Sequence, residues 1–265
     1  MAPLPALYVS HGSPMTALAP GRVGTRLAEL ARDLPRPRAI VVASAHWLAA
    51  RPRVGGAARP ETVHDFGGFP EALYALRYPA PGAPALAQEI AMRLTAEGLR
   101  ADVDPQRGLD HGVWVPLRLL RPEADLPVVP LSIQPALGPA HAFALGRALA
   151  SLRAQGVLVV GSGSITHNLQ DWRGGDDGLQ APYVRPFTDW IEARLRADDL
   201  PALLDYRRQA PFAARAHPAD EHLLPLFVAM GAAGGAQLGA HRIEAGIDMG
   251  FLAMDLYRFD GAGAA

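Results

Sequence analysis

Three histidines stand where apolar, strand-like runs of the chain end. His11 follows the run in ALYVSHGSP, His46 the run in AIVVASAHW, and His167 the run in VLVVGSGSITHN. Short runs rich in Val and Ile, bounded by Gly or Pro, are typical of buried strands in a parallel sheet. Ligands of such sheets bind beyond the carboxyl ends of the strands, so the three imidazoles are predicted to share one edge. Because imidazole binds transition metals and carries protons near neutral pH, the pattern indicates a metal-dependent enzyme.

A third metal ligand is available in the segment HPADEHLLPL, residues 217–226. His222 is the candidate imidazole. Glu221 is the competing carboxylate, which would complete a two-histidine, one-carboxylate site of the kind used by non-haem iron oxygenases. We expect a helix near 219–231 here, with Pro218 in its first turn and Pro225 as a kink or a restart.

Two further histidines are candidates for proton transfer. His111, in LDHGVWVPL, and His167, in SITHNL, are each a candidate general base toward a reacting hydroxyl, and His167 is alternatively a fourth metal ligand. Trp47 and Phe66 are candidates to stack on an aromatic substrate, although such side chains more often belong to a core. His64 joins them because its segment, HDFGGFP, adjoins the predicted site.

The composition excludes several other chemistries. The 265 residues include no cysteine, which excludes disulfides, thiolate catalysis and cysteine-ligated metals, and no lysine, which excludes Schiff-base chemistry. With 25 basic against 26 acidic residues the net charge is −1, which argues against nucleic acid or a membrane surface as a partner. No apolar run has the length of a membrane helix, and the first residues lack a signal-peptide pattern, so we expect a cytoplasmic protein; the oligomeric state is not indicated.

The elements that must position these residues alternate between strand and helix. Strands are expected near 5–10, 38–45, 128–133 and 157–162, with weaker ones near 100–104, 236–241 and 251–257. Helical patterns lie near 22–33, 84–97, 112–120, 139–154, 183–197 and 219–231. The alternation predicts one α/β domain over residues 1–265, with a mostly parallel or mixed sheet, helices on both faces and an antiparallel edge near Gly246. Long loops at 47–82 and 163–182 are expected to wall the site.

Six segments together carry a resemblance to a known family. They are HGSP (11–14), SAHW (44–47), HDFGGFP with YPAPG (64–70 and 78–82), DHGVWVPL (110–117), GSGSITHN (161–168) and HPADEHLLPL (217–226). In this order and over nearly the whole chain, they resemble the class III extradiol ring-cleavage dioxygenases, most closely the DOPA-dioxygenase-like branch.

The resemblance implies one divalent metal per chain, with Fe(II) expected for turnover and Zn(II) as an alternative bound ion. It implies His11 and His46 as ligands, and His222 where the wider family uses a glutamate. It places His111 and His167 at positions tied to substrate and acid–base steps, with a small aromatic diol and O2 as reactants. Gly67 departs from the bulky aromatic that related sequences often carry, which predicts a larger pocket.

Two other functions are compatible with the same residues. One is a zinc hydrolase, in which a metal-activated water attacks an amide or ester without any need for oxygen. The other is a non-catalytic binding protein on the same scaffold, whose partner binding would survive loss of His11 and His46. The intact set of histidines argues against the binding protein.

Overall fold

Four parallel strands form the centre of the sheet, and each is an apolar run that the sequence predicts. The computed structural model describes residues 2–172, 174, 179–234 and 237–261. Its central strands are β1 (Ala6–Ser10), β2 (Ala39–Leu48), β5 (Val128–Ile133) and β6 (Val157–Gly163), which pair in the order β5-β2-β6-β1. Almost every residue in them is buried, as expected for strands covered on both faces. The predicted strand positions are therefore confirmed.

Antiparallel strands complete the sheet at both edges. The full order within the described residues is β4-β3-β5-β2-β6-β1-β10-β7, so the sheet is mixed, as predicted. One edge carries β3 (Arg53–Gly55) and β4 (Asp102–Asp104), and the other β10 (Leu256–Phe259) and β7 (Ala240–Ile243). The antiparallel pairing of β7 with β10 confirms the expected edge, whereas β3 lies inside a predicted loop. Two short strands, β8 (Ile247–Asp248) and β9 (Leu252–Ala253), form a separate hairpin.

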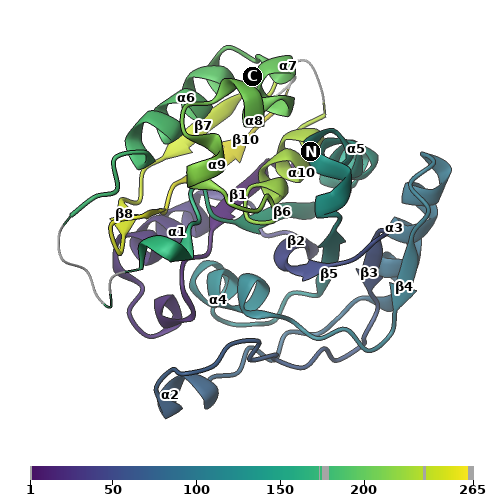
Figure 1. The fold of residues 1–265 in the computed structure, drawn as a ribbon. Coiled ribbons are helices and arrows are strands. Elements are labelled where there is room, and N and C mark those ends of the chain that lie inside the picture. The colour runs from purple at the N-terminus through teal and green to yellow at the C-terminus, as the bar shows by residue number, and fades with distance from the viewer. Residues whose placement is uncertain (1, 173, 175–178, 235–236, 262–265) are drawn as a thin grey trace.

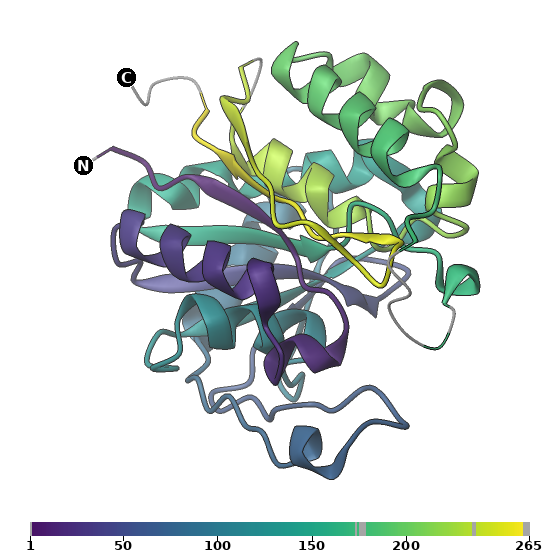
Figure 2. The ribbon, with the colours of Figure 1, turned by 90° about the vertical axis from the view of Figure 1, so that its left-hand side faces the viewer.

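Helices cover both faces of the sheet, as Figure 2 shows. α1 (Gly21–Asp33) and α4 (His111–Leu120) pack together on one face. α10 (Leu224–Ala232), buried on all sides, lies between the other face and α5 (Gly138–Leu149), with α3 (Pro84–Ala96) beside α5. Near β7, Figure 1 shows α6 (Val184–Arg196) with the short helices α7 (Leu200–Leu204), α8 (Tyr206–Gln209) and α9 (Ala213–Ala216). α2 (Glu71–Tyr74) lies in the long loop after β3.

The start of α10 differs from the sequence prediction. The helix expected from residue 219 begins at Leu224, and residues 218–223 form turns. Proline lacks an N–H and its ring collides with the carbonyl four residues earlier, so it is best accommodated in a first helical turn. Pro225 therefore sets the start of α10 and leaves His222 in the turn before it.

A buried arginine ties the end of the chain to its beginning. The Arg153 guanidinium donates hydrogen bonds to the carbonyls of Leu4, Ala232, Ala233 and Asp260. Burial lowers the pKa of Arg153, and the nearby Asp260 carboxylate partly opposes this. Among the described residues, no helix is both long enough and apolar enough to cross a bilayer.

Candidate metal centre and active site

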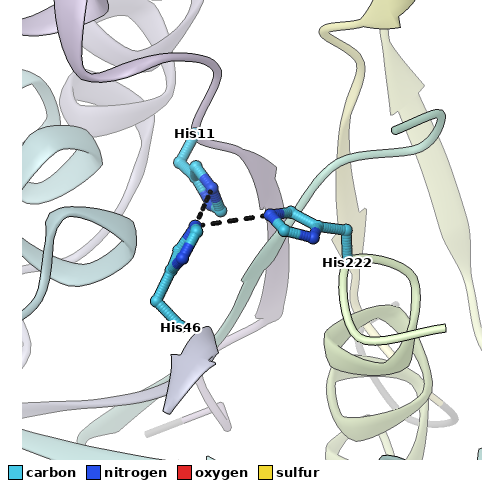
Figure 3. Close-up of side chains that lie close together, drawn as sticks. All are labelled: His11, His46 and His222. Atoms are coloured by element: carbon cyan, nitrogen blue, oxygen red, sulfur yellow. Dashed lines mark hydrogen bonds between the residues drawn. The ribbon is translucent and has the colours of Figure 1, made fainter. Parts of the chain in front are cut away.

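Three histidines from distant parts of the chain converge at one edge of the sheet. His11 follows β1, His46 lies near the end of β2, and His222 precedes α10. Figure 3 shows the rings of His11 and His222 pointing toward that of His46. The Nε2 atom of His46 lies 3.0 Å from Nε2 of His11 and 3.3 Å from Nε2 of His222. One ligand nitrogen from each of the three residues lies within 4.8 Å of the others.

The spacing of these nitrogens fits a shared metal ion. A tetrahedral zinc ion with Zn–N bonds of about 2.05 Å would separate its ligand nitrogens by about 3.3 Å. The observed separations of 3.0 and 3.3 Å are close to this value. The three side chains could therefore hold one divalent cation without a change of backbone.

A serine on β6 fixes the tautomer of His11. Ser162 Oγ lies 3.0 Å from His11 Nδ1, and its own proton is donated to the carbonyl of Gly112. Because the hydroxyl has only one proton, it must accept a hydrogen bond from Nδ1–H of His11. The lone pair of His11 is therefore on Nε2, which faces the other two histidines. Hydrogen bonds of this kind orient metal-binding imidazoles and raise their basicity.

A carboxylate does the same for His222. Nδ1 of His222 lies 3.0 Å from Glu221 Oε1, so it carries the proton and leaves the lone pair on Nε2. Because His11 and His222 carry their protons on Nδ1, their Nε2 atoms carry none. Of the three Nε2 atoms that face one another, only that of His46 could therefore carry a proton. Two lone pairs face a common point, and a cation there would satisfy them. Glu221, the alternative ligand, is thus placed behind His222 as its hydrogen-bond partner.

Glycines of the GSGS segment bring His222 to the sheet. A Cβ atom on Gly163 would lie 2.0 Å from the carbonyl oxygen of His222. That carbonyl accepts a hydrogen bond from the backbone N–H of Ser164 at 2.9 Å and from the hydroxyl of Tyr8 at 3.3 Å. The glycine therefore allows the close backbone approach that positions the third histidine.

A dyad of Asp65 and His111 lies beside the three histidines. Asp65 Oδ1 accepts hydrogen bonds from His111 Nδ1 at 3.0 Å and from the His111 backbone N–H at 2.9 Å. The His111 ring lies 3.9 Å from that of His46. Burial acts to raise the pKa of Asp65, but its contacts with His111 outweigh burial and lower it to about 2. Asp65 was missed in the sequence, although it lies between two residues of HDFGGFP that were selected.

Burial keeps the clustered imidazoles neutral, which is the form that binds metals. It lowers the pKa of His11 and His222 well below the ordinary value, and mutual repulsion among the histidines lowers it further. It likewise lowers the pKa of His46 to about 3 and that of His167 to about 4. A neutral imidazole has the lone pair that a metal requires.

His167 occupies a different place from the other three. Its ring stacks on that of His222 with centroids 3.5 Å apart and planes within 8° of parallel. Its ligand nitrogen groups with a ligand atom of Glu221 and of His222, whereas His46 groups with His11 and His222 and, separately, with Asp65 and His111. His167 therefore flanks the candidate metal centre.

The histidines, together with Ser13, Ser164 and Glu221, form the polar part of a cavity of about 890 Å3. Phe66 lines this cavity as predicted, together with apolar side chains that the sequence did not single out: Met15, Phe69, Leu169, Trp172, Met249, Phe251 and Leu252. Gly68, and not Gly67, borders the cavity, and a Cβ on Gly67 would meet nothing within 4 Å. The expected effect of Gly67 on pocket size therefore stays a prediction.

Trp47 and His64 do not line the cavity, which corrects the sequence expectation. Successive side chains of a strand point to opposite faces, so Trp47 faces away from the side that His46 occupies. The guanidinium of Arg107 covers the buried Trp47 ring at 4.7 Å. His64 places Nε2 3.1 Å from the carbonyl of Leu76, within the loop that contains α2.

Comparison with known proteins identifies relatives over nearly the whole chain. Residues 5–246 match the family model described as the catalytic LigB subunit of aromatic ring-opening dioxygenase. A 4,5-DOPA dioxygenase extradiol of Beta vulgaris is 41% identical over 256 residues, 95% of each chain. Another from Escherichia coli K12 is 39% identical over 257 residues, 95% of this chain and 93% of that protein. The crystal structure of an uncharacterized E. coli K12 protein superposes with a TM-score of 0.78 at 32% identity, covering 97% and 99% of the two chains.

Proposed function

Because the chain belongs to the LigB family and is therefore an oxidoreductase that opens aromatic rings, we propose that it is a metal-dependent extradiol dioxygenase that cleaves a catechol with O2. The convergence of three Nε2 atoms in a cavity large enough to admit a catechol is the observation that carries the proposal. The names of the relatives make DOPA the first catechol to test.

In this proposal His11, His46 and His222 hold the metal. Fe(II) is the ion expected to support turnover, because Zn(II) lacks an accessible redox state. When bound, a redox-active ion supplies a site for both the catechol and O2 and a route for electrons between them. Ser162 and Glu221 hold two of the ligands in the tautomer that binding requires.

The remaining residues of the site act on protons and on water. Asp65 holds Nδ1–H of His111, so the lone pair at Nε2 of His111 is available to accept the proton of a catechol hydroxyl. Asp65 also stabilises the cation that His111 becomes, as a carboxylate does for a catalytic imidazole. Burial keeps His167 neutral, and it borders the cavity from the side of His222. The apolar walls limit the access of water.

Oxygen uptake by protein loaded with Fe(II) without air tests the proposal. Addition of catechol and air is expected to consume O2 and to produce a yellow ring-opened product. Protein loaded with Zn(II) is expected to bind catechol without cleaving it. Fractionation of producing cells tests the cytoplasmic location that the sequence predicts.

Matched histidine variants connect the activity to the cluster. His11→Ala and His46→Ala are expected to abolish both metal retention and cleavage, whereas His241→Ala, at an exposed position on β7, retains both. Anaerobic hydrolysis of esters or amides by the zinc form, without O2 uptake by the iron form, would instead identify a hydrolase. Retention of metal by both cluster variants would contradict the ligand assignment.

A further inference from the structure

The cavity is polar mainly at the histidine cluster, and Ser13, Ser164 and Glu221 are the other polar side chains among the described residues that line it. Its other walls come from several separate segments and carry side chains of Met, Phe, Leu and Trp. Met15 follows β1, Phe66 and Phe69 belong to the loop before α2, and Met249 belongs to the β8–β9 hairpin. A catechol that reaches the cluster therefore has hydrocarbon beside its ring on several sides.

Two of these apolar side chains are unusually exposed. Leu169 and Trp172, on the segment that follows His167, are 65% and 49% exposed, and both line the cavity. Asp171, which lies between them in the sequence, turns to the protein instead, where it accepts hydrogen bonds from Tyr183 and Arg215. The segment thus presents its apolar side chains to the cavity and holds its carboxylate elsewhere. Large apolar side chains exposed at a cavity are characteristic of a surface that binds an apolar group.

No arginine is among the described residues that line the cavity. Apart from the histidines, Glu221 is the one charged side chain among them, and its Oε1 already binds His222. Two nearby guanidinium groups are engaged away from it, because Arg215 pairs with Asp171 and Arg107 with Asp110. A carboxylate on a substrate would therefore find no guanidinium among the described lining residues, whose polar side chains apart from the histidines are Ser13, Ser164 and Glu221. Burial of such a group without a partner is unfavourable.

We propose that the preferred substrate is a catechol whose ring substituent is uncharged and apolar, rather than an amino-acid substituent such as that of DOPA. The inference rests on the proposed ring cleavage and adds the substrate class. Each buried methylene of a substituent is expected to raise kcat/KM about fourfold, from the hydrophobic contribution of a CH2 group. A propyl group fully enclosed by these walls would contribute up to about 50-fold over unsubstituted catechol.

Four catechols with side chains of similar size test the proposal directly. They are propylcatechol, which is neutral; dihydroxyphenylpropionate, which is anionic; dopamine, which is cationic; and DOPA, which is zwitterionic. We expect kcat/KM of the iron enzyme to be at least about tenfold higher for propylcatechol than for dihydroxyphenylpropionate or DOPA. Anaerobic calorimetry with the zinc form should give the same order of Kd values. Equal or better turnover and binding of DOPA would overturn the inference.

Variants of the apolar segment connect the preference to its residues. Leu169→Gln and Trp172→Gln are expected to lower the ratio of kcat/KM for propylcatechol over dihydroxyphenylpropionate at least about fivefold. Met92→Gln is the matched control, because Met92 is 65% exposed on α3 and does not line the cavity.

The two levels of the proposal fail in different ways. If no catechol is cleaved by protein that retains its metal, the proposed reaction is wrong. If catechols are cleaved but charge on the substituent has no effect or a favourable one, only the inference about substrate class is wrong.

Discussion

Substitution of Gly163 by alanine tests whether close approach of two backbones builds the metal centre. The added Cβ would lie 2.0 Å from the carbonyl oxygen of His222 and 3.0 Å from its carbonyl carbon. Contacts below 3.0 Å are essentially never observed for Cβ atoms, so the turn that carries His222 must move by about 1 Å. Metal ligands tolerate displacements of only about 0.2 Å. We therefore expect Gly163→Ala to lower zinc affinity about 100-fold or more, with a loss of about 1–3 kcal/mol in stability from overpacking.

Competition with a chromophoric chelator measures the zinc affinity, and urea unfolding of the metal-free protein measures the stability. Gly67→Ala is the matched control, since its Cβ would meet nothing within 4 Å. It should leave both quantities unchanged. If Gly163→Ala stayed folded and bound zinc as tightly as the parent protein, the proposed role of the GSGS segment would be refuted.

Three other changes have effects that follow from the structure. Ser162→Ala removes the hydroxyl that fixes the His11 tautomer, so zinc affinity measured by chelator competition should fall about 10–100-fold, whereas the exposed Ser151→Ala should have no effect. Arg153→Met leaves buried carbonyls without a partner, and urea unfolding should show a loss of about 3–5 kcal/mol with unchanged zinc affinity of the folded protein. Burial lowers the pKa of His217 from 6.5 to about 4, so the unfolded chain binds its proton first as the pH falls. The resulting stability, about 3 kcal/mol from His217 alone, is present above pH 6.5 and lost toward pH 4. In urea titrations of the metal-free protein, His217→Asn should therefore weaken the dependence of the free energy of unfolding on pH.

The central strands and the convergence of the histidines could be predicted because both depend on short-range patterns. Continuous apolar runs identify strands buried on two faces, and parallel strands bring their carboxyl ends to one edge. His11 and His46 could be placed together on this basis alone, before any comparison with a family. His222 is not at a strand end, so the strand pattern does not decide whether His222 or Glu221 is the third ligand. The hydrogen bond from Nδ1–H of His222 to Glu221 favours His222, because it leaves Glu221 as the partner of that imidazole.

Other features depend on contacts between segments that no local pattern reveals. The role of Asp65 arises because its loop folds back onto the start of α4, 46 residues later. Trp47 is a candidate in the sequence because its ring could stack on an aromatic substrate, but the alternation of a strand places it on the face opposite to that of its neighbour His46. The short strand β3 was missed because three residues among Gly, Pro and Arg give too little periodicity to detect.

The arrangement of hydrogen-bond partners indicates that the candidate metal centre is formed in the absence of an ion. Ser162 and Glu221 orient the rings of His11 and His222, and the backbone N–H of Ser164 and the hydroxyl of Tyr8 hold the turn that carries His222. None of these contacts needs an ion, so zinc should bind with little change in structure and with a small heat-capacity change. The same burial that keeps the imidazoles neutral makes the metal-free protein sensitive to acid, because protonation is more favourable in the unfolded chain. Bound metal should therefore widen the pH range of stability chiefly on the acid side, as mass action on the folded state requires.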